Sequence, residues 1–182
     1  MTIDIPGYKA GTYAIDASHS EVGFEVRHMM IARVRGHFGA VSGTITLPEN
    51  LLEASVDAKV ETASVSTKDD GRDAHLRSAD FFDTEQFPEI TFVSTAVRED
   101  GGDLVVDGDL TIKGITKKVT FTVEVGGFGG DPFGNFKAGG TATTTINRED
   151  FGLTWNAALE TGGVLVGKDV KITLDLEAVF QA

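Results

Sequence analysis

The chain has 182 residues, no cysteine, and a net charge of −12 from 28 acidic and 16 basic side chains. Its length predicts one domain, and the lack of cysteine excludes disulfides, thiolate nucleophiles and cysteine-ligated metal centres. An acidic surface repels nucleic acid and anionic lipid headgroups, so we expect neither nucleic-acid binding nor electrostatic docking on a membrane. No run of about 18 apolar residues is present, so we expect no membrane insertion either. Residues 1–10 lack the basic and apolar regions of a secretory signal, which predicts a cytoplasmic protein, although a leader already removed would leave the same sequence.

Apolar and polar side chains alternate along most of the chain, the pattern of strands with one buried and one exposed face. In the last segment, for example, the even positions from 170 to 180 are all apolar. After a loose extension over residues 1–10, we expect strands over residues 12–16, 22–30, 34–47, 52–60, 90–97, 104–112, 115–125, 136–146 and 170–180. Within residues 34–47 the apolar parity shifts near Gly39 and Ala40, which predicts a β-bulge.

One segment, residues 68–82, breaks this alternation. Leu76 and Ala79 stand three apart and acidic residues open the segment, which predicts a short helix in a connection between strands. Glycine and proline mark the turns, with a tight hairpin expected over residues 113–116 and a loop over residues 126–134. No repeat or linker divides the chain, so residues 1–182 are expected to form a single domain.

Eight or more strands with one apolar face each must close on themselves to bury those faces and remove free sheet edges. The fold class is therefore all-β, and a closed antiparallel barrel is the expected architecture. A barrel of about eight strands is just wide enough to be filled by side chains or to hold one small ligand. Small residues of one parity, Ala138, Gly140, Ala142 and Thr144, favour a hollow interior, whereas the phenylalanines opposite could fill it.

Two glycine-rich segments resemble nucleotide-binding loops only superficially. Residues 162–168 have the spacing of a phosphate-binding loop, but Asp169 stands where Ser or Thr should hold magnesium. The segment that follows alternates as a strand, whereas a phosphate loop opens a helix. Residues 126–130 lack the third glycine of a dinucleotide-binding turn. We expect a glycine-rich hairpin and a loop at these two places.

The sequence supplies no spacing typical of a catalytic or metal site. The four histidines are His19, His28, His37 and His75. Histidines hydrogen-bonded at strand ends are the simplest interpretation, and a metal site, haem site or enzyme built from them is the alternative. We therefore predict no catalytic residue, no metal and no cofactor.

Seven short motifs run in order through nearly the whole chain. They are Tyr13-x-Ile-Asp-x-x-His-Ser-x-Val-x-Phe-x-Val-Arg-His-Met29, Val34-Arg-Gly-x-Phe38, Arg72-Asp-x-His-Leu76 with Phe81-Phe-Asp83, Phe87-Pro-x-Ile-x-Phe92, Gly108-x-Leu-Thr-Ile-x-Gly-Ile-Thr116, Asn147-Arg-x-Asp-Phe-Gly-Leu-x-Trp155 and Val166-Gly-x-Asp-Val-x-Ile172. Each motif is weak alone. Together and in this order they resemble the YceI-like family, the lipocalin-like polyisoprenoid-binding proteins.

The resemblance implies an extended, lipocalin-like, eight-stranded antiparallel barrel with a helix beside it. It also implies a homodimer, and an interior that holds a long apolar chain such as a polyprenyl or isoprenoid-quinone tail. No catalytic residue is agreed for the family, so the expected function is that of a non-enzymatic lipid-binding or carrier protein. A ligand-free barrel that acts as a dimeric stress-response or interaction protein is the alternative. The sequence names neither the natural ligand nor the pathway.

Alternation also predicts which side chains would touch a ligand inside the barrel. Inward, chiefly apolar positions suit a chain that has no hydrogen-bonding groups. The candidate ligand-binding residues are Phe24, Val26, Phe38, Phe92, Leu110, Phe121, Val123, Ala142, Trp155, Ile172 and Leu174.

Overall fold

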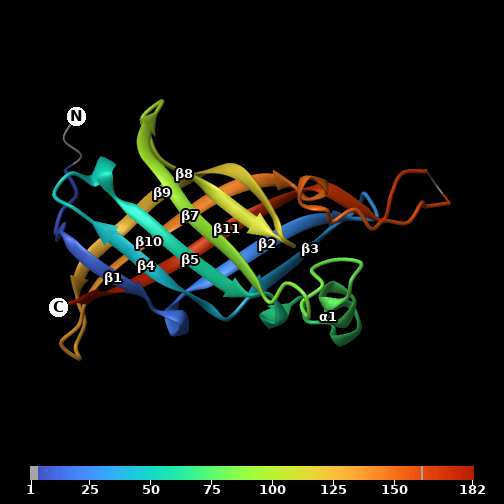
Figure 1. Ribbon diagram of the computed structural model, residues 1–182, viewed down its shortest axis with the longest axis horizontal. Helices are drawn as coiled ribbons and strands as arrows, with labels where there is room; N and C mark the ends of the chain where they lie inside the picture. Colours follow the sequence, from blue (N-terminus) through green and yellow to red (C-terminus); the bar gives the residue numbers. More distant parts are fainter. Residues whose placement is uncertain (1–3, 161) are drawn as a thin grey trace.

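The structure, a computed structural model that describes residues 4–160 and 162–182, is an elongated antiparallel β-barrel (Figure 1). Eight strands pair in a closed ring, each with the next and the last with the first. In ring order they are β1 (Gly11–Ile15), β4 (Val41–Leu47), β5 (Ser55–Glu61), β7 (Glu89–Asp100), β8 (Asp103–Ile112), β9 (Ile115–Gly130), β10 (Phe136–Asn147) and β11 (Val166–Gln181). The expected closed eight-stranded barrel is thus confirmed.

Three further strands extend the barrel at the end opposite the chain termini (Figure 1). They are β2 (Glu21–His28), β3 (Ala32–Phe38) and β6 (Val65–Ser66), which pair in that order beside β11. The long strand β11 pairs with β1 near its C-terminal end and with β2 along its N-terminal part. The chain passes between the ring strands and these extra strands through three short breaks. They are the 3₁₀ turns Ala17–His19 and Thr62–Ser64 and residues 39–40. The strands β2, β3 and β6 therefore continue the sheet outside the closed ring.

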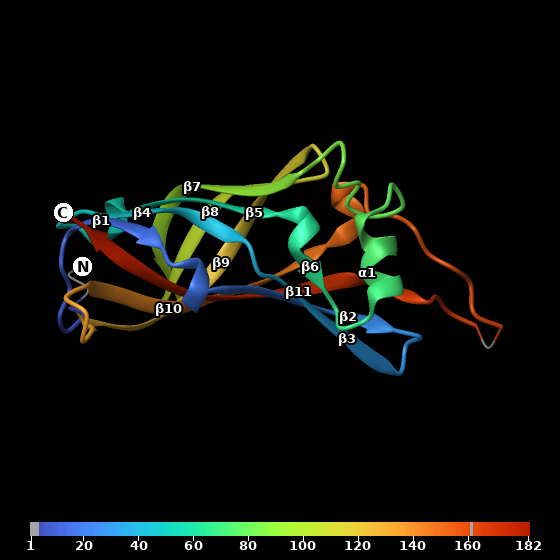
Figure 2. The same ribbon diagram turned by 90° about the horizontal axis from the view of Figure 1, so that it is seen from below.

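Helix α1 (Asp70–Arg77) lies at the barrel end opposite the chain termini (Figure 2). Its presence confirms the short helix expected in the connection between strands. Asp69 caps its first turn by accepting the Arg72 backbone N–H. The buried Asp73 carboxylate accepts from the backbone N–H and hydroxyl of Thr67, at 2.8 and 2.6 Å. Arg77 donates to the carbonyl of Val65 in β6. These bonds fasten the helix to the extra strands.

Several local expectations were wrong. The strands expected over residues 22–30 and 52–60 are shorter, because the chain turns after His28 and β5 begins only at Ser55. Residues 34–47 do not form one strand with a bulge, because the parity shift at Gly39 and Ala40 is a break between β3 and β4, which pair with different neighbours. Residues 126–130 are not a loop, because β9 continues to Gly130 and pairs with β10 across a bulge at residues 139 and 140. The tight hairpin at residues 113–116 is confirmed, and Lys113 and Gly114 both have positive φ.

Many of the buried apolar side chains of the described residues group into three clusters on the barrel wall. One lies around Phe38 and Val65, near α1, and a second around Leu110 and Phe151. The third surrounds Tyr13, next to the chain termini. Most members of these clusters also line a cavity inside the barrel. The part of the chain that the structure describes has no helix long and apolar enough to cross a membrane.

Candidate ligand-binding cavity

The barrel encloses an apolar cavity of about 440 Å³. Small-molecule sites have volumes of roughly 300–1,000 Å³, so this cavity has ligand dimensions. Every strand of the closed ring contributes to the wall. The alternation of apolar and polar residues explains the lining, since every second side chain of each strand points inward.

All eleven residues predicted from the sequence lie on the wall of this cavity. They are Phe24, Val26, Phe38, Phe92, Leu110, Phe121, Val123, Ala142, Trp155, Ile172 and Leu174. Trp155 reaches the wall for a different reason from the others, because it belongs to the loop that precedes β11 and not to a strand. Sequence reasoning missed the inward residues of β1, β4 and β5, including Ile15, Ile45 and Val56, which the same alternation could have identified.

Glycines on the wall let aromatic rings lie flat against the sheet. Phe24 of β2 pairs with Gly36 of β3, and its ring occupies the space that a Cβ at Gly36 would need. The ring of Phe92 covers Gly108 of β8 in the same way. An aromatic ring over a glycine on a neighbouring strand is a known device for fixing register. Here it also keeps these two rings on the wall and out of the middle of the bore.

Three consecutive inward positions of β10 carry small residues. Ala138, Gly140 and Ala142 line the cavity along this strand, and Ala142 lies between Val123 and Leu174 of the neighbouring strands. The sequence left open whether the phenylalanines fill the barrel. The structure shows a hollow interior bounded on this side by small residues.

An aromatic cluster narrows the barrel end that carries the chain termini. The edge of Tyr13 faces the rings of Phe128 and Phe180, with centroids 6.2 and 5.5 Å away. Tyr8 makes a second edge-to-face contact with Phe128, and its hydroxyl donates to the Pro48 carbonyl. Burial raises the pKa of the Tyr13 hydroxyl, which donates to the Lys9 carbonyl. Part of the segment that the sequence indicated as a loose extension is therefore held on the barrel.

The opposite end is shaped by the loop between β10 and β11, which a buried arginine holds in place. Arg148 is only 3% exposed, and its guanidinium donates to the carbonyls of Leu153, Trp155, Val166 and Gly167. Burial lowers the pKa of this guanidinium, which nevertheless stays protonated. These bonds place Trp155 against His75 of α1, at 4.7 Å between ring centroids, and against Phe81 at 5.5 Å. The helix and the loop thus meet at the cavity's edge.

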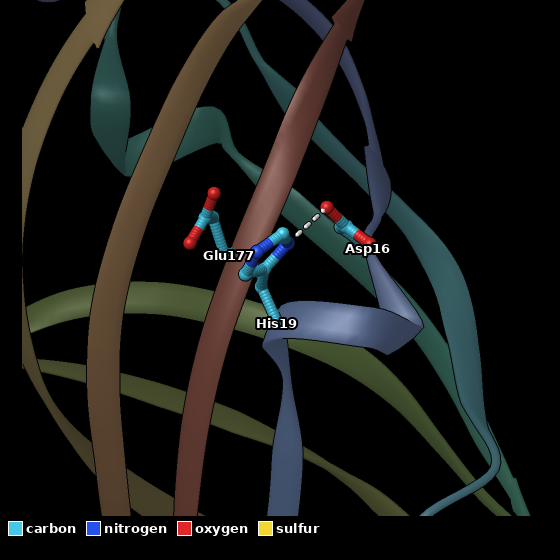
Figure 3. Close-up of side chains that lie close together, drawn as sticks. All are labelled: Asp16, His19 and Glu177. Carbon is cyan, nitrogen blue, oxygen red and sulfur yellow. Dashed lines mark hydrogen bonds and ion pairs between the residues drawn. The ribbon is translucent and has the colours of Figure 1, made fainter. Parts of the chain in front are cut away.

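A polar cluster on the outside of the barrel offers a potential metal site. Asp16, His19 and Glu177 bring three potential ligand atoms within 4.8 Å of one another (Figure 3). The Lys137 ammonium already lies between the two carboxylates, 2.7 Å from Glu177 and 3.4 Å from Asp16. The hydrogen bond from His19 and those from Ser18 hold the pKa of Asp16 well below its usual range. The cluster therefore has a structural role, capping the turn between β1 and β2.

The four histidines do not assemble into one site. His19 contacts Asp16, His37 lies 3.5 Å from Glu21, and His75 lies 2.9 Å from Asp80. His28 ends β2 at the cavity wall. Among the residues that the structure describes, no potential metal cluster contains two histidines. The glycines at 162 and 163 turn a short hairpin before β11, so a strand and not a helix follows them.

Comparison with known proteins agrees with this architecture. The family model for the YceI-like domain matches residues 13–178. UPF0312 proteins from Staphylococcus aureus strains MSSA476 and N315 are each 42% identical over 170 residues, covering 91% of this chain and 95% of the relative.

Solved structures share the barrel. Burkholderia cenocepacia BcnA is 26% identical with a TM-score of 0.77, and the alignment covers 90% of this chain and 98% of that one. A Campylobacter jejuni YceI protein is 27% identical, with a TM-score of 0.71 and coverage of 86% and 90%. A polyisoprenoid-binding domain from Saccharophagus degradans, implicated in plant cell wall breakdown, shares the fold at 17% identity, with a TM-score of 0.72 and coverage of 95% and 100%. This chain belongs to the YceI-like family.

Proposed function

We propose that this protein binds a long, flexible apolar molecule, an isoprenoid or a similar amphiphilic lipid, inside the barrel and acts as a carrier without catalysis. The observation that carries the proposal is the continuous apolar cavity of about 440 Å³. Apolar burial favours such a ligand by about 0.8 kcal/mol for each CH₂ group, before the cost of ordering a flexible chain. The fold shared with a polyisoprenoid-binding domain supports the same class of ligand.

The shape of the cavity favours an extended ligand over a compact one. Along β11 the wall runs from Val166 to Ala178. At about 3.3 Å per residue and a strand tilt of about 40°, this stretch corresponds to roughly 30 Å along the barrel axis. A linear prenyl chain fits such a bore, whereas a rigid compact ligand of equal volume would leave much of it empty.

Mass spectrometry of organic extracts from natively purified protein tests the proposal. We expect a long-chain lipid in the extract, or stoichiometric uptake of an added prenyl alcohol by delipidated protein, observed by native mass spectrometry. Uptake should increase with prenyl chain length until the bore is filled. The bound molecule should be recovered chemically unchanged, as a carrier requires. An empty extract together with no uptake at any chain length would refute the proposal and favour the ligand-free interaction protein.

The homodimer implied by the family resemblance and the cytoplasmic location expected from the N-terminal sequence remain predictions. Light scattering of the purified protein tests the first, with twice the 19.3 kDa chain mass expected. Fractionation of the source cells tests the second.

A further inference from the structure

The turn between β2 and β3 exposes three consecutive large apolar side chains. Met29 is 44% exposed, Met30 54% and Ile31 83%. Val164, on the neighbouring hairpin before β11, is also exposed. Together they account for half of the strongly exposed large apolar side chains in the described part of the chain. We call Met29, Met30 and Ile31 the apolar tip.

The fold alone does not require methionines at this turn. Met29 and Met30 have φ of 53° and 62°, the left-handed region that Asn and Gly adopt at least cost. Backbone conformations of this kind are unfavourable for residues other than glycine, and they cluster at functional sites. The turn therefore carries exposed apolar side chains at a cost in backbone strain, which points to a role in binding.

The apolar tip adjoins one end of the cavity. Arg27 and His28, the residues directly before the tip, are on the cavity wall. The Met30 sulfur lies directly over Gly163, next to the segment that contributes Leu165 and Val166 to the same wall. The tip lies at the α1 end of the barrel, away from both chain termini (Figure 2). A lipid leaving the barrel at this end would pass close to the tip.

The hairpin that bears the tip differs in charge from the rest of the protein. Arg33 and Arg35 lie 2.8 and 3.4 Å from one carboxylate, Glu25, and Arg27 donates to the Met30 carbonyl. The chain as a whole carries −12. At physiological salt, charges farther than about 8 Å apart are largely screened, so the acids at the far end of the barrel contribute little at the tip.

We propose that the apolar tip docks on an anionic lipid bilayer, with Met29 and Ile31 entering the interface and the hairpin arginines facing the headgroups, so that lipid passes directly between the bilayer and the cavity. This inference rests on the proposed function. The net charge of the chain led us to expect no docking on anionic lipid. That expectation describes the whole surface, whereas this proposal concerns one end of the barrel.

Flotation with vesicles tests the docking. We expect the protein to float with phosphatidylcholine vesicles that contain phosphatidylglycerol. The double variant Met29→Ser/Ile31→Ser should bind at least tenfold more weakly, because the side chains that enter the interface are lost. Phe133→Ser is the matched control: Phe133 is 86% exposed but lies in the turn before β10, beside Asp131 and near the chain termini, and its replacement should change nothing.

A second variant tests the charge. Arg33→Gln/Arg35→Gln should weaken binding to phosphatidylglycerol vesicles by about fivefold for each arginine, with little effect on pure phosphatidylcholine vesicles. Raised salt should reduce the difference. Equal flotation of the wild type and both double variants would overturn the proposal. Absence of flotation of the wild-type protein would also overturn it. Dissociation of a wild-type dimer on Met29→Ser/Ile31→Ser substitution would overturn it too, because the tip would then serve self-association.

Loading the barrel with a prenyl alcohol from solution and from vesicles distinguishes the docking proposal from the proposed function. The tip variant should take up a prenyl alcohol from dilute ethanol solution as the wild type does, because neither changed residue is on the cavity wall. It should load more slowly from phosphatidylglycerol vesicles that contain the same alcohol. Equal rates from vesicles would overturn the docking and leave the proposed function standing. Failure of every protein to load from solution would refute the proposed function itself.

Discussion

Replacing Ala142 with phenylalanine places a phenyl ring in the bore of the barrel. Ala142 lies near the middle of β10, is 9% exposed, and has its side chain on the cavity wall. Its partners across the sheet are Val123 and Leu174, both of which also line the cavity. The larger side chain therefore projects into open space between the two barrel ends.

The cavity volume sets the expected size of the effect. A dry cavity of about 150 Å³ accommodates a benzene ring, so the new ring takes at most about a third of the 440 Å³. Because the ring enters a void, we expect the free energy of unfolding to change by less than about 1 kcal/mol. A filled core would instead be overpacked, at a cost of about 1–3 kcal/mol. The new ring obstructs the cavity near its middle, so a long-chain ligand can no longer extend along its full length.

Native mass spectrometry with prenyl alcohols of graded length, together with urea unfolding, measures both effects. The Ala142→Phe variant should lose the longest ligands and keep its stability. Thr145→Phe, on the same strand but exposed and absent from the cavity wall, is the control and should bind as the wild type does. Undiminished binding of the longest ligand by a folded Ala142→Phe variant would show that the ligand does not pass β10. A loss of several kcal/mol would show that the interior has no free space there.

Three further changes test the residues around the cavity and on the barrel surface. Arg148→Met should lower the free energy of unfolding by about 3 kcal/mol, because buried carbonyls lose their donor; a loss below about 1 kcal/mol in urea unfolding would contradict the role of Arg148. Gly108→Ala should cost about 1–3 kcal/mol, because the new Cβ collides with the Phe92 ring; unchanged stability would show that the ring moves freely. The hydrogen bond from Arg98 lowers the pKa of Asp107 to about 2, so the stability that Asp107 contributes is present above its ordinary pKa near 4 and is lost as the pH falls towards 2. Arg98→Met should raise that pKa in an NMR titration, and an unmoved value would refute the pairing.

The candidate site was largely predictable because it depends on alternation, a property of neighbouring residues in one strand. Ten of the eleven predicted residues reach the cavity wall from strands. Trp155 arrives there through the bonds of Arg148 to the loop carbonyls. No spacing in the sequence indicates those bonds, because they join residues that only the fold brings together.

The failed expectations have a common physical reason. A parity shift looks the same in sequence whether a strand bulges or breaks, and the pairing partners decide between the two. At residues 39–40 the chain leaves β2 as a partner and takes up β1 and β5. Glycines at 126–130 were interpreted as a loop, yet a strand accepts them where a neighbouring strand supplies the hydrogen bonds.

The sequence by itself determined the all-β class, most strand positions, the helix in the connection, the faces that turn inward and, through its seven motifs, the family. These are properties of local periodicity and short motifs. Only the tertiary structure decided that β11 pairs with β1 at one end and β2 at the other, that aromatic rings lie over glycines, and that an exposed apolar turn stands at one end of a hollow barrel. Such features depend on contacts between segments that are distant in the sequence, and these contacts form only in the closed barrel.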